Sequence, residues 1–306
     1  MTTQILEPGQ IEAAAGDIPE LRLPEARAFS DRARRLRQLA DGHSLGEYLH
    51  FVAHLSEAQQ SLLDHLADIP LPSADLLARC REHAMPPLAS AGWSRHPVWL
   101  AIARDLADAM DKWAPESGRA ALARVGEAND TWLETQAEAL LDGSVESLDL
   151  ACAPVIGAAL QVYWHHLASQ LQPRDVARPE HPNLCPVCGS HPVASVLRIG
   201  GAESGLRYLH CALCGSEWHV VRAKCSNCDN TRDIAYYMLE GDQGPVRAEA
   251  CPECHSYLKV VHQDKDPNVD PVADDLASLA LDLLVAEQGY DKSGLNFLMI
   301  HGPVGI

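Results

Sequence analysis

Apolar positions in the first half of the chain recur at the spacing of amphipathic helices. From residue 45 to about residue 67 they roughly follow one helical stripe. Ser44 and Glu47 have the spacing of a capping box, and Gly143 suits a helix end. Helices are therefore predicted at residues 44–67, 74–83, 97–112 and 117–141.

The segment 154–171 is apolar on nearly every side, so we expect it to be the central buried helix of a bundle. A proline-rich connector follows, and we place a domain boundary at residues 173–184. Near the end of the chain, Pro271 suits a first helical turn and Gly289 suits a helix stop. Leucines between them form one face, which predicts a C-terminal helix that packs on the rest of the molecule.

Alternating apolar positions between these two helical regions predict strands instead. Three strands are expected in each of two successive units: residues 193–199, 206–210 and 218–223, then residues 234–239, 246–250 and 257–262. Glycines within 200–205 and 241–244 suit the hairpin turns.

These patterns together predict an α+β fold class. We expect a helical N-terminal domain, a linker, two tandem rubredoxin-like or zinc-ribbon β modules, and an acidic segment that contains the C-terminal helix. The corresponding residues are 1–172, 173–184, 185–223, 224–262 and 263–306.

Eight of the ten cysteines lie in the β region, with a repeated spacing. Each unit has two CxxC pairs separated by 22 residues, and each cysteine of the second unit follows its counterpart by 40 positions. Such self-similarity indicates an internal duplication. The cysteines are Cys185, Cys188, Cys211 and Cys214 in the first unit, and Cys225, Cys228, Cys251 and Cys254 in the second.

Two CxxC knuckles can supply the four sulfurs of a closed tetrahedral site. Modules of about 40 residues rarely fold on their apolar core alone, and metal binding worth ~10–16 kcal/mol would stabilise them. The eight cysteines are therefore predicted to be the ligands of two mononuclear metal sites. A nested pairing, in which Cys211 and Cys214 join Cys225 and Cys228, stays open, although the equal 22-residue gaps favour sequential pairing.

The ligand set does not choose between iron and zinc, since a tetrahedral site of four sulfurs accepts either. Gly189 and Gly215 follow the knuckles of the first unit, as in rubredoxins. The second unit has Asp229 and His255 at these positions. Because Asp tolerates a left-handed backbone, this departure weakens the argument for iron without removing it.

Length and charge restrict the function. The chain has 306 residues, about two domains by length, and its 24 Lys and Arg residues against 42 Asp and Glu residues give a net charge of −18. Residues 1–180 have 15 basic and 26 acidic side chains, residues 181–262 have 7 and 8, and residues 263–306 have 2 and 8. Such acidity disfavours nucleic acid and anionic membranes as partners.

The N-terminal residues have no basic start and no apolar segment, and we find no transmembrane stretch. We therefore predict a cytoplasmic protein, without membrane insertion, whose cysteines stay reduced. Nucleotide-binding, nucleophile-elbow and H-E-x-x-H motifs are also missing, so we do not expect an enzyme.

Several other candidates are interpreted as structural. His50 and His54 have a spacing that can grip a metal, but no Glu follows His50. Three histidines lie near the knuckles, where four cysteines already complete each site. These histidines are His210, His219 and His255. Cys80 and Cys152 are interpreted as core residues, His165 and His166 as a polar helix end, and Asp274 and Asp275 as capping charges.

Four runs of sequence resemble the FdhE family of formate dehydrogenase accessory proteins, over nearly the whole chain. They are LGEYLHFVAHLSEAQQSLL, GLRYLHCALCGSEWHVVRAKCSNC, AEACPECHSYLK and ADDLASLALDLL. The resemblance implies a non-catalytic cytoplasmic protein that acts on the catalytic subunit of a respiratory formate dehydrogenase before export. It also implies rubredoxin-like iron at the eight cysteines. The alternatives are an iron–thiolate electron carrier or redox enzyme, and a zinc-ribbon adaptor.

Overall fold

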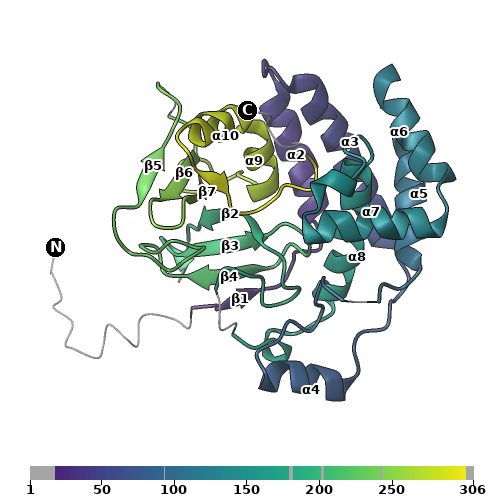
Figure 1. Ribbon diagram of the computed structural model, residues 1–306, viewed down its shortest axis with the longest axis horizontal. Coiled ribbons are helices and arrows are strands. Elements are labelled where there is room, and N and C mark those ends of the chain that lie inside the picture. The colour runs from purple at the N-terminus through teal and green to yellow at the C-terminus, as the bar shows by residue number, and fades with distance from the viewer. Residues whose placement is uncertain (1–17, 93, 179–181, 201–202, 242, 301–306) are drawn as a thin grey trace, which may run out of the picture.

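The computed structural model describes residues 18–92, 94–178, 182–200, 203–241 and 243–300. A helical region lies beside one mixed β-sheet, and two C-terminal helices pack against that sheet (Figure 1). The predicted α+β class is therefore confirmed. The helices before the sheet are α2 (Ala28–Ala40), α3 (Gly46–His65), α4 (Ala74–Glu82), α5 (Val98–Met110), α6 (Glu116–Glu127), α7 (Asp130–Asp142) and α8 (Ala153–Ser169).

Helix α8 is buried along almost its whole length, as its uniformly apolar sequence predicts. The predicted helix 117–141 is instead two helices. Asn129 adopts an extended backbone and its side chain accepts a hydrogen bond from the backbone N–H of Trp132, which caps the start of α7. The capping box predicted at Ser44 and Glu47 is not formed, because α3 begins without a side-chain cap.

The sheet joins both cysteine units into one structure. The first unit supplies the antiparallel strands β2 (Pro192–Leu197), β3 (Arg207–Cys211) and β4 (Glu217–Val220), and the second supplies β5 (Ala235–Tyr237), β6 (Val246–Cys251) and β7 (Ser256–His262). These six strands lie at the predicted positions. The units meet where β2 and β7 pair in parallel, with Ser195 opposite Val260.

Two short strands at the margins of the sheet were not predicted from the sequence. Strand β1 (Leu21–Arg22) extends the edge at β4, and β8 (Asp291–Lys292) pairs with the beginning of β7. The described strand order is β1-β4-β3-β2-β7-β6-β5, with β8 beside β7. Two-residue strands are too short to show alternation, so the pattern of apolar positions does not report them.

The predicted C-terminal helix is also divided, into α9 (Pro271–Ala277) and α10 (Leu279–Glu287). Asp270 caps α9 by accepting hydrogen bonds from the backbone N–H groups of Val272 and Ala273. At the break, Ser278 Oγ donates to the carbonyl oxygen of Asp274 at 2.7 Å. Both helices pack on the sheet, so this segment does not hang free. The predicted packing face is only partly right: Leu276 is buried, but Leu283 and Leu284 are exposed.

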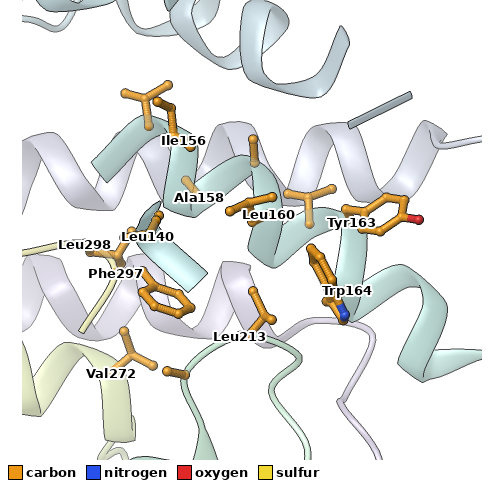
Figure 2. Packing of buried hydrophobic residues seen from close by; sticks show 14 of the residues in the cluster. Leu140, Ile156, Ala158, Leu160, Tyr163, Trp164, Leu213, Val272, Phe297 and Leu298 are labelled. Carbon is orange, nitrogen blue, oxygen red and sulfur yellow. The ribbon is translucent and has the colours of Figure 1, made fainter. Parts of the chain in front are cut away.

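One apolar core runs through the helical region, the first cysteine unit and the C-terminal segment. Figure 2 shows Phe297 near α8, with Leu213 of the first unit and Val272 of α9 in the same cluster. A Cβ atom at Gly157 of α8 would lie only 2.8 Å from Phe297 Cβ, so this close approach requires glycine. The second unit has a separate small cluster: Ala248, Ala250, Tyr257, Leu281 and Val285.

Some sequence predictions concern residues outside the described part of the chain. These are the N-terminal residues 1–17, the centre of the connector at 179–181, and parts of both hairpin turns at 201–202 and 242. The division into domains at residues 172, 184, 223 and 262 stays a prediction. Among the described residues, no helix combines the length and apolar character needed to cross a membrane.

Candidate metal centres

Both units fold the first CxxC pair into the same tight loop. In the first unit, the backbone N–H of Gly189 donates to the Cys185 carbonyl at 2.8 Å, and Cys185 N donates to the Ser190 carbonyl at 2.9 Å. The matching bonds of the second unit, 40 positions later, join Asp229 N to Cys225 O at 3.2 Å and Cys225 N to Asn230 O at 2.8 Å. The duplicated spacing therefore produces a duplicated backbone structure.

The eight cysteines form two groups of four, and within each group all sulfurs lie within 4.8 Å of one another. Sγ–Sγ distances are 3.6 Å for Cys185–Cys214 and 3.4 Å for Cys188–Cys211. In the second group, Cys225–Cys254 and Cys228–Cys251 are both 3.7 Å apart. The grouping follows the sequential pairing, not the nested one.

These distances fit a metal ion. A regular tetrahedron with metal–sulfur bonds of about 2.3 Å has sulfur–sulfur edges of about 3.8 Å. The observed separations are far longer than a disulfide bond of about 2.05 Å, and all ten cysteines are free thiols. Each group could therefore hold one ion with four sulfur ligands.

Hydrogen-bond donors lie close to several of the cysteine sulfurs. The backbone N–H groups of Leu213 and Cys214 both lie 3.4 Å from Cys211 Sγ, and Asn227 N lies 3.3 Å from Cys225 Sγ. Burial raises the pKa of Cys254, but hydrogen bonds from Ser256 and other neighbours outweigh it and lower that pKa to about 6. Thiolates are the form that binds metal.

The first group is enclosed by the helical region. The loop after α4 pairs with the first knuckle, where Leu88 N donates to Val187 O at 2.9 Å and Ser90 N donates to Cys188 O at 2.8 Å. From α8, Gln161 Nε2 donates to the Ala212 carbonyl of the second knuckle at 2.8 Å. All four cysteines of this group are buried.

Burial has a large effect on the first group's protonation. It raises the pKa values of Cys185 and Cys214, whereas hydrogen bonds from the neighbouring cysteines hold the pKa of Cys188 below its usual value despite burial. Four buried thiolates would repel one another, and a bound cation would offset that repulsion.

The second group is more open. Cys225 and Cys251 are buried, Cys254 is half-buried and Cys228 is exposed. Asn230 Nδ2 donates a hydrogen bond to Cys251 Sγ at 3.5 Å.

Most of the other candidate residues have structural partners, as interpreted. His54 stacks on Trp113 with ring centroids 3.5 Å apart, and His210 Nδ1 lies 3.1 Å from Glu217 Oε1. Cys80 and Cys152 are buried free thiols. His165, by contrast, is buried against the first group: a Cβ atom at Gly215, the residue after Cys214, would lie 3.3 Å from His165 Nδ1.

Asp274 and Asp275 were interpreted as capping charges of a first helical turn; Asp274 does lie in the first turn of α9, but both side chains are only 2% exposed and have further partners. Asp274 pairs with Arg35 of α2, with 2.6 Å between Oδ1 and Nη2. Asp275 pairs with Lys259 and Lys292, which lower its pKa although burial raises it. The available signal was that Asp275 shares the apolar face of the predicted helix, so its carboxylate had to be buried with a partner.

The fold and the two clusters define a class of protein: a helical region joined to a pair of four-cysteine knuckle modules. Three family models match it in succession: FdhE, N-terminal at residues 18–181, FdhE, central domain at 184–222, and FdhE, C-terminal domain at 223–299. The chain belongs to the FdhE family.

Individual relatives cover nearly all of the chain. The protein FdhE homolog of Pseudomonas aeruginosa is 44% identical over 307 residues, covering 99% of both chains. The homolog of Edwardsiella ictaluri is 43% identical and covers 99% of this chain and 100% of its own. The crystal structure of the FdhE protein from Pseudomonas aeruginosa matches with a TM-score of 0.86 and 42% identity, over 93% of this chain and 100% of that one.

Proposed function

We propose that this chain is a non-catalytic accessory protein that a respiratory formate dehydrogenase requires for activity. It acts in the cytoplasm and binds the catalytic subunit of that enzyme. The observation that carries the proposal is membership of the FdhE family over nearly the full length, with all eight cysteines gathered into two intact clusters. Free thiols at all ten cysteines are consistent with a reducing compartment.

The eight clustered cysteines are proposed to be the ligands of two metal ions, one for each unit. Iron is the proposed ion, as in rubredoxins, and zinc is the alternative. The protein's own residues form the knuckles, direct backbone N–H groups at the sulfurs and bring four thiolates to one point. When bound, the ion cross-links two knuckles that are about 22 residues apart in each unit, which stabilises a module with little core of its own.

The acidic regions on either side of the cysteine modules favour binding of a basic segment of the partner. Residues 1–180 and 263–306 together have 17 basic and 34 acidic side chains, around a nearly neutral centre. A twin-arginine export signal on the catalytic subunit would be attracted to this surface, more strongly at low salt than at high salt. We propose that the cysteine modules are also needed to hold the subunit.

The central test is complementation in a strain that lacks the gene for this chain and makes the formate dehydrogenase. We expect wild-type chain to restore formate-dependent dye reduction and to co-purify with the catalytic subunit. A variant with Cys225→Ser and Cys228→Ser should fail on both counts, whereas Cys80→Ala, outside the clusters, should behave as wild type. Full enzyme activity in the strain without the chain contradicts the proposal.

The metal is tested separately on protein purified without oxygen. We expect two ions per chain by elemental analysis. Iron would give strong visible absorption after oxidation, because ferric thiolate sites absorb visible light, whereas zinc would leave the protein colourless. A chain that carries no ion in the folded state would contradict the metal sites without affecting the complementation result.

A further inference from the structure

The internal duplication makes each cysteine of one cluster comparable with a partner in the other, and two of the four pairs differ. Cys188 is fully buried, whereas Cys228, its counterpart 40 positions later, is exposed. Cys214 is fully buried, whereas Cys254 is half-buried. In both pairs the ligand of the second cluster is the one that solvent reaches.

The difference follows from what covers each knuckle. In the first unit, the loop around Leu88 and Ser90 is hydrogen-bonded to the backbone of the first knuckle, and Gln161 of α8 is hydrogen-bonded to the second. Opening this cluster would separate knuckles that share the main apolar core, which includes all four of its cysteines. None of the second group's cysteines belongs to that core among the described residues.

The knuckle backbones differ as well. After the second cysteine of each CxxC pair, the first unit has Gly189 and Gly215 at φ +75° and +74°. At the same positions the second unit has Asp229 and His255 at φ 61° and 52°. Asp tolerates this region better than most residues with a Cβ atom, whereas His is strained in it, so the closed knuckles of the second unit store strain, mainly at His255, that those of the first do not.

We propose that the two four-cysteine sites have different roles, the first as a permanent structural site and the second as an exchangeable site for a soft divalent metal ion, which enters and leaves at Cys228. This inference rests on the proposed metal binding at both clusters. With an ion bound, the exposed Cys228 would be the ligand that gives up its metal–sulfur bond first; a donor atom of a chelator would take the vacated position, and a buffer acid would supply the proton that the Cys228 thiolate takes up.

The two clusters can be distinguished by the rate at which each loses its ion. Full-length protein loaded with two zinc ions is mixed with a chromogenic chelator in excess. We expect one ion per chain to leave quickly and the other at least about tenfold more slowly, because the first cluster opens only when the core opens. Release of both ions in a single phase overturns the inference.

Thiol labelling then assigns the fast phase to a cluster. Iodoacetamide is added for short intervals, and the labelled cysteines are identified by mass spectrometry. We expect label at Cys228 and Cys254 during the fast phase, while Cys188 and Cys214 stay unlabelled until the slow phase. Equal labelling of Cys188 and Cys228 contradicts the assignment. A folded chain that binds no zinc at all would instead contradict the proposed metal sites.

A variant that keeps all eight cysteines tests the role of the strained backbone. Asp229→Gly combined with His255→Gly gives the second unit the glycines of the first. We expect the fast phase to slow by about threefold to tenfold, since removing one to two left-handed strains favours the closed knuckles, and the slow phase to stay unchanged. A fast phase at the wild-type rate shows that exposure at Cys228 alone sets the exchange; a change in the slow phase instead contradicts the separation of the two sites.

Discussion

The two cysteine units have the same ligand spacing and the same knuckle hydrogen bonds, but different forces attach them to the molecule. The first unit is attached through the main apolar core, in which its four cysteines are buried beside α8. The second is attached through a small apolar cluster with α10 and through buried charge, because Lys259 of β7 is fully buried and contacts Asp275 and Asp282 of the C-terminal helices. The duplication therefore gave both units the same four-cysteine site, while the elements packed around each unit determine how stable that site is.

This comparison predicts that matched ligand substitutions have unequal effects on stability. Cys188→Ser should lower the melting temperature of the whole chain, because it removes an ion whose binding is worth up to ~10–16 kcal/mol from a cluster inside the main core. Cys228→Ser should remove the second ion and leave the helical transition nearly unchanged. Thermal unfolding followed by circular dichroism, together with metal analysis, measures both. Equal losses of melting temperature contradict the comparison.

The charged attachment of the second unit should be sensitive to a single substitution. Lys259 Nζ donates to Asp282 Oδ2 at 2.6 Å and to the Asp275 carbonyl at 2.8 Å, while burial lowers its pKa. Lys259→Ala leaves two buried carboxylates short of a cation, so we expect the free energy of unfolding to fall by about 3–5 kcal/mol. Urea unfolding of wild type and variant measures this loss.

A matched surface pair provides the control for Lys259→Ala. Arg104 and Asp130 form an ion pair with side chains 32% and 69% exposed. Arg104→Ala should cost only about 0–1 kcal/mol, because water screens exposed charges. A loss for Lys259→Ala no larger than this would show that the second unit does not depend on its buried charges.

Features that depend on residues close together in the sequence could be predicted. The knuckles, the six strands and the grouping of the cysteines depend on spacing and alternation within each unit, and the structure has them where they were predicted. The helices before the sheet were mostly found, because their apolar stripes are long. Breaks at Asn129 and Ser278 were not, since one side chain can divide a helix without changing its apolar period.

The differences between the two clusters depend on contacts that are distant in sequence. Nothing in the residues near Cys188 reports that a loop about 100 positions earlier covers it. The same holds for the parallel pairing of β2 with β7, which joins strands 60 or more residues apart. Only the glycines after the first unit's knuckles, against Asp229 and His255, gave a local sign of the asymmetry.

The stability that His165 contributes beside the first cluster should depend on pH. His165 is 2% exposed, and burial together with Arg32, His210 and His166 lowers its pKa to about 3, although a hydrogen bond with the backbone of Glu25 opposes this. Because the unfolded chain takes up this proton near pH 6.5, the stability that neutral His165 contributes is complete above pH 6.5. It is lost as pH falls from 6.5 towards 3, at about 1.4 kcal/mol per pH unit.

His165→Gln tests this contribution, since glutamine does not titrate. We expect the melting temperature of wild type to fall more steeply between pH 7 and pH 5 than that of the variant, with metal loading matched at each pH. Taking the difference between the two proteins removes the effect of acid on the thiolate ligands, which they share. Parallel curves would show that folding does not change the pKa of His165 and would contradict the prediction.

A smaller effect than at Lys259 is expected from exchanging the residues that follow the knuckles. Gly215→His gives the first cluster the residue of the second, but its Cβ atom would lie 3.3 Å from His165 Nδ1 and 3.5 Å from Pro24 Cβ, at φ +74°. We expect a loss of about 1–2 kcal/mol from backbone strain and crowding. His255→Gly removes a side chain held at φ 52°, so the free energy of unfolding should rise or stay within about 1 kcal/mol. Urea unfolding with both ions bound measures the two changes. Equal losses for the two substitutions would mean that the knuckle surroundings are equivalent in energy, and that the unequal exposure of the two clusters has no consequence for stability.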